Sequence, residues 1–326
     1  MTIVQPALVA QTEDLLIDPS RTPLGSVESW QPLGFVDLDA WSGDTLEVLP
    51  PFPLIALGDR AHPLAAAFDA VLESPVSIEA LIRHVRRAPH AAAVAVQLLR
   101  GVQGMPRGQA LSMESLCYGL LQGSAEHAAW LASRAPTTRR DPAGGLVVER
   151  RDSVLHLWLD RPLARNAIDR DLRDQLFEAF SVAALDTAVS AVKLRATGTA
   201  FSVGGDLGEF GTSRDPVTAH LIRSRTLPAL ALGERAAILD VHVQGACIGA
   251  GLEIAAFAGR LTATSDAWFQ LPELAMGLIP GAGGCVSVPR RIGRQRTALM
   301  ILSGRRISAA TALRWGLIDA IEEKAR

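Results

Sequence analysis

The chain has 326 residues, 48% of them hydrophobic and 20% charged, and this composition excludes a chain that is disordered throughout. Its 32 basic and 34 acidic residues leave a formal net charge of -2, so no overall field attracts nucleic acid or an anionic membrane. The three cysteines form no CxxC pair and match no zinc spacing, which argues against a disulfide scaffold or a metal site. Without a basic leader or an apolar run of about 18 residues, we expect a reduced, cytoplasmic protein with no membrane partner.

The N-terminal part of the chain is predicted to be mainly helical after an irregular start. Up to Pro53 it mixes prolines, acids and isolated tryptophans, and no regular element is predicted there. Apolar residues then recur three and four positions apart, which predicts helices, with Ser77 as a cap. The helical segments are 63–74, 77–88, 91–102 and 112–134. The last segment carries the pattern on Leu116, Leu120 and Leu121, and then on Trp130 and Leu131.

A second region follows a connection rich in proline, glycine and charge at 135–145, where we place a domain boundary. Two alternating apolar stretches around a polar turn, 146–150 and 154–160, predict a β-hairpin. Strands then alternate with helical stretches, the first over 170–184. The sequence therefore predicts a helical region over 1–145 and an α/β domain over 146–326.

Three strands of the α/β domain end in turns of small residues next to an acid, at 201–207, 243–253 and 269–284. Glycine at a turn lets the backbone approach a ligand and direct its amides towards it, as an oxyanion hole requires. Each turn alone is more simply a tight turn, but the threefold recurrence predicts a ligand site beyond the strand ends.

Other nucleotide and hydrolase motifs are excluded by spacing. A dinucleotide fingerprint would need a third glycine where Ile254 stands, and the glycine-rich GAGGC lacks the GK[ST] ending of a P-loop. Ser202 is no nucleophile elbow, because Ala200 stands two residues before it. NAD, ATP and a serine nucleophile are therefore disfavoured.

At RPLARNAID (161–169) the sequence resembles the RPxxxNA motif of the crotonase, or enoyl-CoA hydratase/isomerase, superfamily. AFSVGGDL, HVQGACIGAGLE and LPELAMGLIPGAGG follow in the order of that family. The stretch from Gly304 to Glu323 resembles the family's segment in which a helix of small residues leads to a Gly-Leu-Ile/Val strand. The resemblance covers about 146–323. It implies a crotonase-like ββα spiral with two roughly perpendicular sheets, and acyl-CoA bound beyond the strand ends.

The resemblance also implies roles for particular backbone positions. The amides of Gly205 and Ala250 match the oxyanion hole, in which fixed dipoles stabilise negative charge on a thioester oxygen. Arg165, Ala167 and Val203 match positions that hold CoA. No cofactor is implied beyond the CoA of the substrate.

Two acids decide the reaction, because Glu253 and Glu273 match the family's catalytic glutamates. One carboxyl can take a proton from water while the other gives one to the α carbon, which favours an enoyl-CoA hydratase. Without the resemblance, Glu253 is equally well an acid at a helix start and Glu273 an exposed loop acid. The alternatives are an isomerase using Glu273 alone, a specialised crotonase (thioester hydrolase, ring-cleaving enzyme or oxygenase), or a non-catalytic acyl-CoA-binding subunit.

The remaining expectations concern the walls of the site and the assembly. Family members usually continue with C-terminal helices that cover the CoA site, and we expect the helices over 63–134 to take their place. A homo-oligomer, trimer or hexamer, is implied by the family. The expected acyl-pocket lining is Trp268, Phe269, Leu271, Met276 and the loop 210–216.

Overall fold

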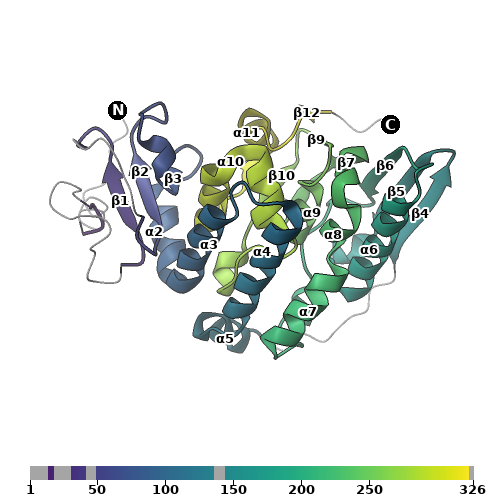
Figure 1. The fold of residues 1–326 in the computed structure, drawn as a ribbon, viewed down its shortest axis with the longest axis horizontal. Coiled ribbons are helices and arrows are strands. Elements are labelled where there is room, and N and C mark those ends of the chain that lie inside the picture. Colours follow the sequence, from purple (N-terminus) through teal and green to yellow (C-terminus); the bar gives the residue numbers. More distant parts are fainter. Residues whose placement is uncertain (1–13, 18–30, 42–48, 136–143, 323–326) are drawn as a thin grey trace.

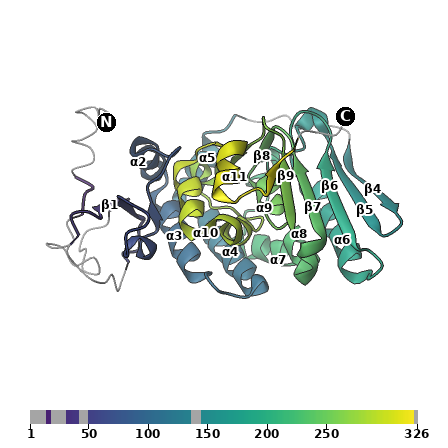
Figure 2. The ribbon, with the colours of Figure 1, turned by 90° about the horizontal axis from the view of Figure 1, so that it is seen from above.

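The computed structural model describes residues 14–17, 31–41, 49–135 and 144–322 (Figure 1). A small sheet lies at one end of the molecule, a layer of helices in the middle, and a larger sheet at the other end (Figures 1 and 2). The chain passes from the small sheet through the helices α2 to α5, and the later helix α10 then returns to pack among them.

The N-terminal sheet was not predicted. Its parallel strands pair in the order β1, β2, β3, with bounds Gly34–Asp37, Leu54–Leu57 and Ala70–Val71. The helix predicted over 63–74 is wrong, because this segment forms the 3-10 turn η2 (Ala65–Ala67) and β3. Its Asp69, 1% exposed, accepts a hydrogen bond from the amide of Leu54 at 2.9 Å and pairs with Arg100 at 2.6 Å. These distant partners favour the extended backbone over the local helical pattern.

The other N-terminal helices are confirmed. They are α2 (Ile78–Arg87), α3 (Pro89–Gly101), α4 (Arg107–Gln122) and α5 (Ala125–Ala132). Ser77 caps α2 as predicted, accepting from the amide of Ala80 at 3.3 Å. The segment 112–134 divides in two because Ser124 starts a new helix, with its hydroxyl accepting from the amide of His127 at 3.1 Å.

Of the three leucines that carry the predicted pattern of helix α4, Leu121 is buried as expected and the other two are exposed. Leu116 and Leu120 are 51% and 67% exposed, whereas Glu114 is 1% exposed and Ser115 is also buried. The apolar pattern therefore identified the helix, but it assigned Leu116 and Leu120 to the buried face. The partners of Glu114, described below, explain why a polar face turns inward.

The α/β domain contains two further sheets, as the fold class requires. The large sheet has the order β12-β9-β7-β6-β5-β4, and the smaller one β11-β10-β8. The predicted hairpin is confirmed, because β4 and β5 are antiparallel. From β7 to β10 the chain alternates between the two sheets, which is the course of a ββα spiral. The bounds are β4 (Gly145–Arg151), β5 (Val154–Asp160), β6 (Ala191–Ala196), β7 (Leu239–Val243), β8 (Ala246–Ile248), β9 (Arg260–Ala263), β10 (Trp268–Gln270), β11 (Ile307–Ser308) and β12 (Ala320–Ile321).

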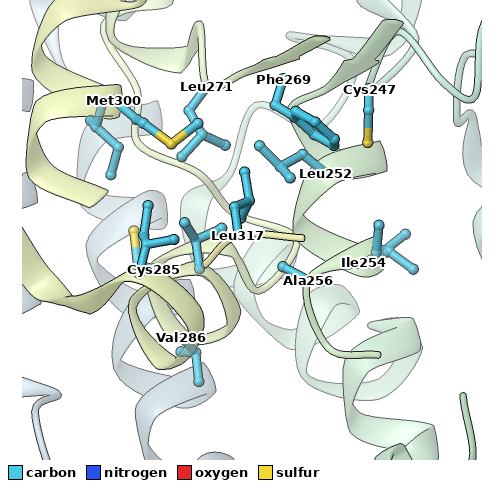
Figure 3. Close-up of a cluster of buried hydrophobic side chains, with 14 of the residues drawn as sticks. Cys247, Leu252, Ile254, Ala256, Phe269, Leu271, Cys285, Val286, Met300 and Leu317 are labelled. Carbon is cyan, nitrogen blue, oxygen red and sulfur yellow. The ribbon is translucent and has the colours of Figure 1, made fainter. Parts of the chain in front are cut away.

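The helices of this domain surround the two sheets (Figure 2). They are α6 (Arg170–Leu185), α7 (Pro216–Thr226), α8 (Pro228–Leu232), α9 (Ala250–Ala255), α10 (Gly284–Ser303) and α11 (Ala309–Trp315). Leu252 of α9, Phe269 of β10 and Met300 of α10 meet in one buried cluster (Figure 3). In the described ranges, no helix combines the length and apolarity needed to cross a bilayer.

Removing the N-terminal region is expected to unfold the α/β domain. Helices α2, α3 and α4 pack against α10, so a chain beginning at Gly144 would expose the apolar side of that helix. We expect loss of cooperative thermal unfolding by circular dichroism, and recovery when residues 1–143 are supplied as a separate chain. A shortened chain that unfolds cooperatively by itself would contradict this coupling.

The boundary predicted at 135–145 stays a prediction, because 136–143 lie outside the described residues.

Candidate active site

A cavity of about 240 Å³ is lined by both the N-terminal helices and the α/β domain. From the N-terminal region come Tyr118 of α4 and His127 of α5. From the α/β domain come Gly205, Ala250, Glu253 and Glu273, so the structure brings all four residues predicted for catalysis to one cavity.

The RPxxxNA motif is fixed beside this cavity by buried polar contacts. Asn166, fully buried, accepts a hydrogen bond from the amide of Arg161 at 2.8 Å. The Arg161 guanidinium pairs with Asp169 at 2.6 Å, and both side chains are buried. The amide of Ile168 then donates to the carbonyl of Gly204 at 2.8 Å. The motif thus holds the turn that carries Gly205.

The three residues predicted to hold CoA lie together beside the same turn. Arg165 is exposed, with a left-handed φ of 50°, and its carbonyl accepts from the amide of Val203 at 3.2 Å. The carbonyl of Ala167 accepts from Arg161 at 2.9 Å. None of the three belongs to the described wall of the cavity, and their contact with CoA stays a prediction.

The two residues predicted to form an oxyanion hole, Gly205 and Ala250, both line the cavity. Ala250 is the first residue of α9, so its amide has no partner within the helix. Within the described ranges, neither this amide nor that of Gly205 donates to another residue. The two turns approach closely, because a β-carbon placed at Gly204 would lie 3.6 Å from the Ala250 nitrogen. Both donors are therefore free to bind an oxygen in the cavity.

Glu253 extends from α9 towards the start of α10 and is 2% exposed. Its Oε2 accepts from the amides of Ala282 at 2.6 Å and Gly284 at 2.8 Å. Burial raises the pKa of Glu253 to about 7, although these two hydrogen bonds act in the opposite direction. A β-carbon at Gly284 would lie 2.6 Å from Cγ of Glu253, so glycine is what permits this approach.

Glu273 begins the 3-10 turn η6 (Glu273–Met276) and is 8% exposed. Its Oε2 is buried and has no hydrogen-bond partner in the described part of the chain. Burial, and then the charge of Glu253, raise the pKa of Glu273 well above its ordinary value. A β-carbon at Gly249 would lie 2.6 Å from Oε1 of Glu273. The two acids thus line one cavity, and the charge of Glu253 makes ionisation of Glu273 harder.

The expected acyl-pocket lining is only partly confirmed. Phe210 and the next three residues of the loop line the cavity, but Trp268, Phe269, Leu271 and Met276 are absent from its wall. Phe269 and Leu271 are fully buried in the core cluster beside α9 and α10 (Figure 3). For Phe269 and Leu271 the prediction is wrong because β10 and the residue after it direct these two side chains into the core of the α/β domain.

Sequence reasoning missed the residues that the N-terminal helices bring to the site. Tyr118 packs its ring against Gly281 and lies 4.5 Å from the guanidinium of Arg223. His127, 3% exposed, places its Nδ1 at 2.9 Å from the carbonyl of Met276, at the end of η6. The signal that could have identified this face is that Glu114 and Tyr118, four residues apart, lie on one side of a helix. The prediction over 112–134 relied on the leucines instead.

Among the described residues, no cluster of three or more histidine, cysteine or acidic side chains has the arrangement of a metal site. Three acids do interact electrostatically, because the charge of Glu253 raises the pKa of both Glu114 and Glu273.

The sequence matches the profile of the family Enoyl-CoA hydratase/isomerase over residues 149–325. Among curated proteins it is 34% identical to 2,3-dehydroadipyl-CoA hydratase of Escherichia coli, over 54% of this chain and 68% of that protein. It is 33% identical to an enoyl-CoA isomerase/hydratase of Mycosarcoma maydis, over 52% of this chain and 65% of that protein. The curated relatives are thus covered over about two thirds of their length.

Solved structures agree with these sequence matches. An enoyl-CoA hydratase subunit from Geobacillus kaustophilus superposes with a TM-score of 0.50 at 25% identity, over 56% of this chain and 70% of that one. A Thermobifida fusca protein described as an enoyl-CoA hydratase, solved with acetoacetyl-CoA, superposes with a TM-score of 0.50 at 26% identity, over 58% and 77%. The motifs, the alternating sheets and these matches agree, and the chain belongs to the enoyl-CoA hydratase/isomerase family, within the crotonase superfamily.

Proposed function

We propose that the protein is an enoyl-CoA hydratase, which adds water across the α,β double bond of an acyl-CoA thioester. The observation that carries the proposal is the presence of Glu253 and Glu273 in one cavity with two unpartnered amides, those of Gly205 and Ala250. The E. coli relative is named for the hydration of an unsaturated CoA ester, and the T. fusca structure holds a CoA thioester, which supports the assignment of substrate class.

The order in which the two acids ionise assigns their roles, because the charge of Glu253 is one of the causes that raise the pKa of Glu273. Glu253, with a pKa of about 7, is the group that ionises first and takes a proton from water. The water oxygen then bonds to the β carbon, and the π electrons move towards the thioester oxygen, held by the amides of Gly205 and Ala250. Glu273, whose pKa burial and then the charge of Glu253 raise well above its ordinary value, gives its proton to the α carbon. One water molecule is consumed. The proton that Glu253 took from it passes through solvent to Glu273, so that both carboxyls return to their starting states.

This assignment predicts a pH dependence. Because Glu253 must be ionised, kcat/KM for hydration should fall as the pH drops through about 7, and protonation of Glu253 is the cause. A pH profile measured with crotonyl-CoA checks this expectation. A rate that stays level from neutral pH down to about 5, near the ordinary range of a glutamate, would contradict the role of Glu253 as base.

The experiment that tests the function is the loss of enoyl absorbance when the pure protein is mixed with crotonyl-CoA and with longer and aromatic enoyl-CoA esters. A panel of β,γ-enoyl-CoA esters, followed by gain of the conjugated absorbance, tests the isomerase alternative in the same experiment. Turnover of the first panel supports hydration. Turnover of the β,γ-enoyl-CoA panel alone would show that the protein is an isomerase and not a hydratase. Tight binding of CoA esters without turnover of either panel would indicate a specialised reaction or a binding subunit.

We propose three further properties on the evidence of sequence and family. The protein works in the cytoplasm, it uses no cofactor beyond the CoA of its substrate, and it assembles as a homo-oligomer. Exposed apolar residues on the outer face of α4 (Met113, Leu116 and Leu120) support association. Light scattering on the purified chain measures the oligomeric state, and a monomeric mass would overturn that part.

A further inference from the structure

Tyr118 of α4 lines the cavity that contains Glu253 and Glu273, and it is the single tyrosine of the chain. Its hydroxyl makes no hydrogen bond to any residue that the structure describes. This hydroxyl is also absent from the buried side-chain atoms without a partner, so it is open to the cavity. A tyrosine hydroxyl can both donate and accept a hydrogen bond, and here both capacities are available to a ligand.

Two neighbours fix the ring of Tyr118. The guanidinium of Arg223 lies 4.5 Å from the centre of the ring. It also donates to the hydroxyl of Ser115 at 3.0 Å and to the side-chain oxygen of Gln122 at 2.9 Å, which ties α7 to α4. The ring packs against Gly281, where an added β-carbon would lie 2.3 Å from Cδ2 of the tyrosine. The hydroxyl is therefore held in place before any ligand binds, as an effective catalytic donor should be.

The turn before α10 joins the helix that carries Tyr118 to the proposed base. Four successive amides, from Ala282 to Cys285, bind two carboxyls there. The first and third donate to Oε2 of Glu253, and the second and fourth donate to Glu114 of α4, at 2.7 and 2.8 Å. One turn therefore anchors both Glu253 and α4, which places Tyr118 on the side of the cavity where water is activated.

The polar groups around this point leave one bonding position for water. Both amide hydrogen bonds of Glu253 are on Oε2, and no described residue donates to its Oε1. Burial raises the pKa of Tyr118 above its ordinary value, and Arg223 acts in the opposite direction. The charges of Glu253 and Glu273 add to the rise, so both carboxyls lie within electrostatic range of the hydroxyl. Near neutral pH Tyr118 therefore keeps its proton and serves as a donor.

We propose that Tyr118 is a further catalytic residue, whose hydroxyl donates a hydrogen bond to the oxygen of the attacking water. This inference rests on the proposed function, because it concerns the water that Glu253 deprotonates. The water oxygen accepts from Tyr118 with one electron pair, gives one proton to Glu253, and bonds to the β carbon with its other pair. Tyr118 keeps its own proton throughout, and in the reverse reaction it stabilises the departing hydroxide.

The test is the variant Tyr118→Phe, which removes the hydroxyl and retains the ring beside Gly281 and Arg223. We expect kcat for hydration of crotonyl-CoA to fall about tenfold, the effect of one hydrogen bond at the upper end of the usual range. KM should change little, because the enoyl ester carries no oxygen on its β carbon. A kcat within twofold of that of the unchanged protein would overturn the inference.

The matched control is Ser112→Ala on the same helix. The hydroxyl of Ser112 is exposed and donates to the carbonyl of Gly108 at 3.0 Å, away from the cavity wall. Its removal also deletes one hydroxyl from α4, but kcat and KM should stay at their original values. An equal loss of kcat in this control would mean that Tyr118→Phe acts through the helix and not through the water.

A measurement without turnover uses the single tyrosine of the chain. Tyrosine labelled with 13C at its ζ carbon gives one NMR resonance, which responds to hydrogen bonding of the hydroxyl. Acetoacetyl-CoA carries an oxygen on the β carbon, where the water oxygen would bond, whereas butyryl-CoA carries none. We expect acetoacetyl-CoA alone to shift the resonance. Tyr118→Phe should weaken binding of acetoacetyl-CoA by about 3- to 10-fold and leave binding of butyryl-CoA unchanged.

The same measurement separates failure of the inference from failure of the proposed function. An equal shift with both esters, or no shift with either, overturns the role of Tyr118 even if the protein is a hydratase. If the protein hydrates no ester but acetoacetyl-CoA alone shifts the resonance, the proposed function fails. In that case Tyr118 remains the donor to a ligand oxygen on the β carbon.

Discussion

Replacing Glu253 by glutamine is expected to lower kcat for hydration by about 10²- to 10⁴-fold, the range typical for loss of one general acid or base. Glutamine retains an oxygen for the amides of Ala282 and Gly284 but cannot take a proton from water. KM should change little, because Glu253 acts on water and not on the CoA ester. Stopped-flow loss of enoyl absorbance measures kcat, and circular dichroism of the same sample confirms that the fold is retained.

The same variant distinguishes the two reactions of the family. A shift of the double bond needs one carboxyl that removes and returns a proton, which Glu273 can supply alone, so isomerisation of a β,γ-enoyl-CoA should survive in Glu253→Gln. Hydration within a few fold of the unchanged protein would remove Glu253 from the mechanism. Equal loss of both reactions would mean that Glu253 also serves the isomerase chemistry.

Replacing Glu273 by glutamine is expected to lower kcat by a similar factor of about 10² to 10⁴ and to abolish the double-bond shift as well. In the proposed mechanism Glu273 is the acid that reaches the α carbon in both reactions, and its Oε2 has no hydrogen-bond partner among the described residues. Rapid-mixing assays with conjugated and β,γ-unsaturated esters measure the two losses side by side. Retained hydration in this variant would assign proton delivery to a group other than Glu273.

Stability provides the control for this second variant. Burial raises the folded-state pKa of Glu273 above its unfolded value, so ionisation is easier in the unfolded chain. The unchanged protein therefore loses stability from this group as the pH rises above about 4.3, the ordinary value for glutamate. Glu273→Gln lacks that loss. We therefore expect the free energy of unfolding of the variant, measured by urea titration, to increase relative to that of the unchanged protein as the pH rises. A catalytic loss accompanied by unfolding would be explained by the fold instead.

Local signals predicted much of the secondary structure. Ser77, the predicted cap of α2, accepts from the amide of Ala80 at 3.3 Å. Such caps act within one turn of the chain, so the sequence alone can show them. The segment 63–74 failed because β3 depends on the contact of Asp69 with Arg100, a partner 31 residues away. Helical spacing reports nothing about such a partner.

The sequence by itself determined the family, the spiral of strands and the identity of four cavity residues, because Gly205, Ala250, Glu253 and Glu273 lie in ordered motifs. Only the tertiary structure decided how the N-terminal region completes the site. Periodicity favoured an inward leucine face for α4, yet the amides at the start of α10 require acceptors, and Glu114 supplies them from within. These partners of Glu114 lie 169 and 171 residues further along the chain, so the spacing of residues within α4 carries no information about them.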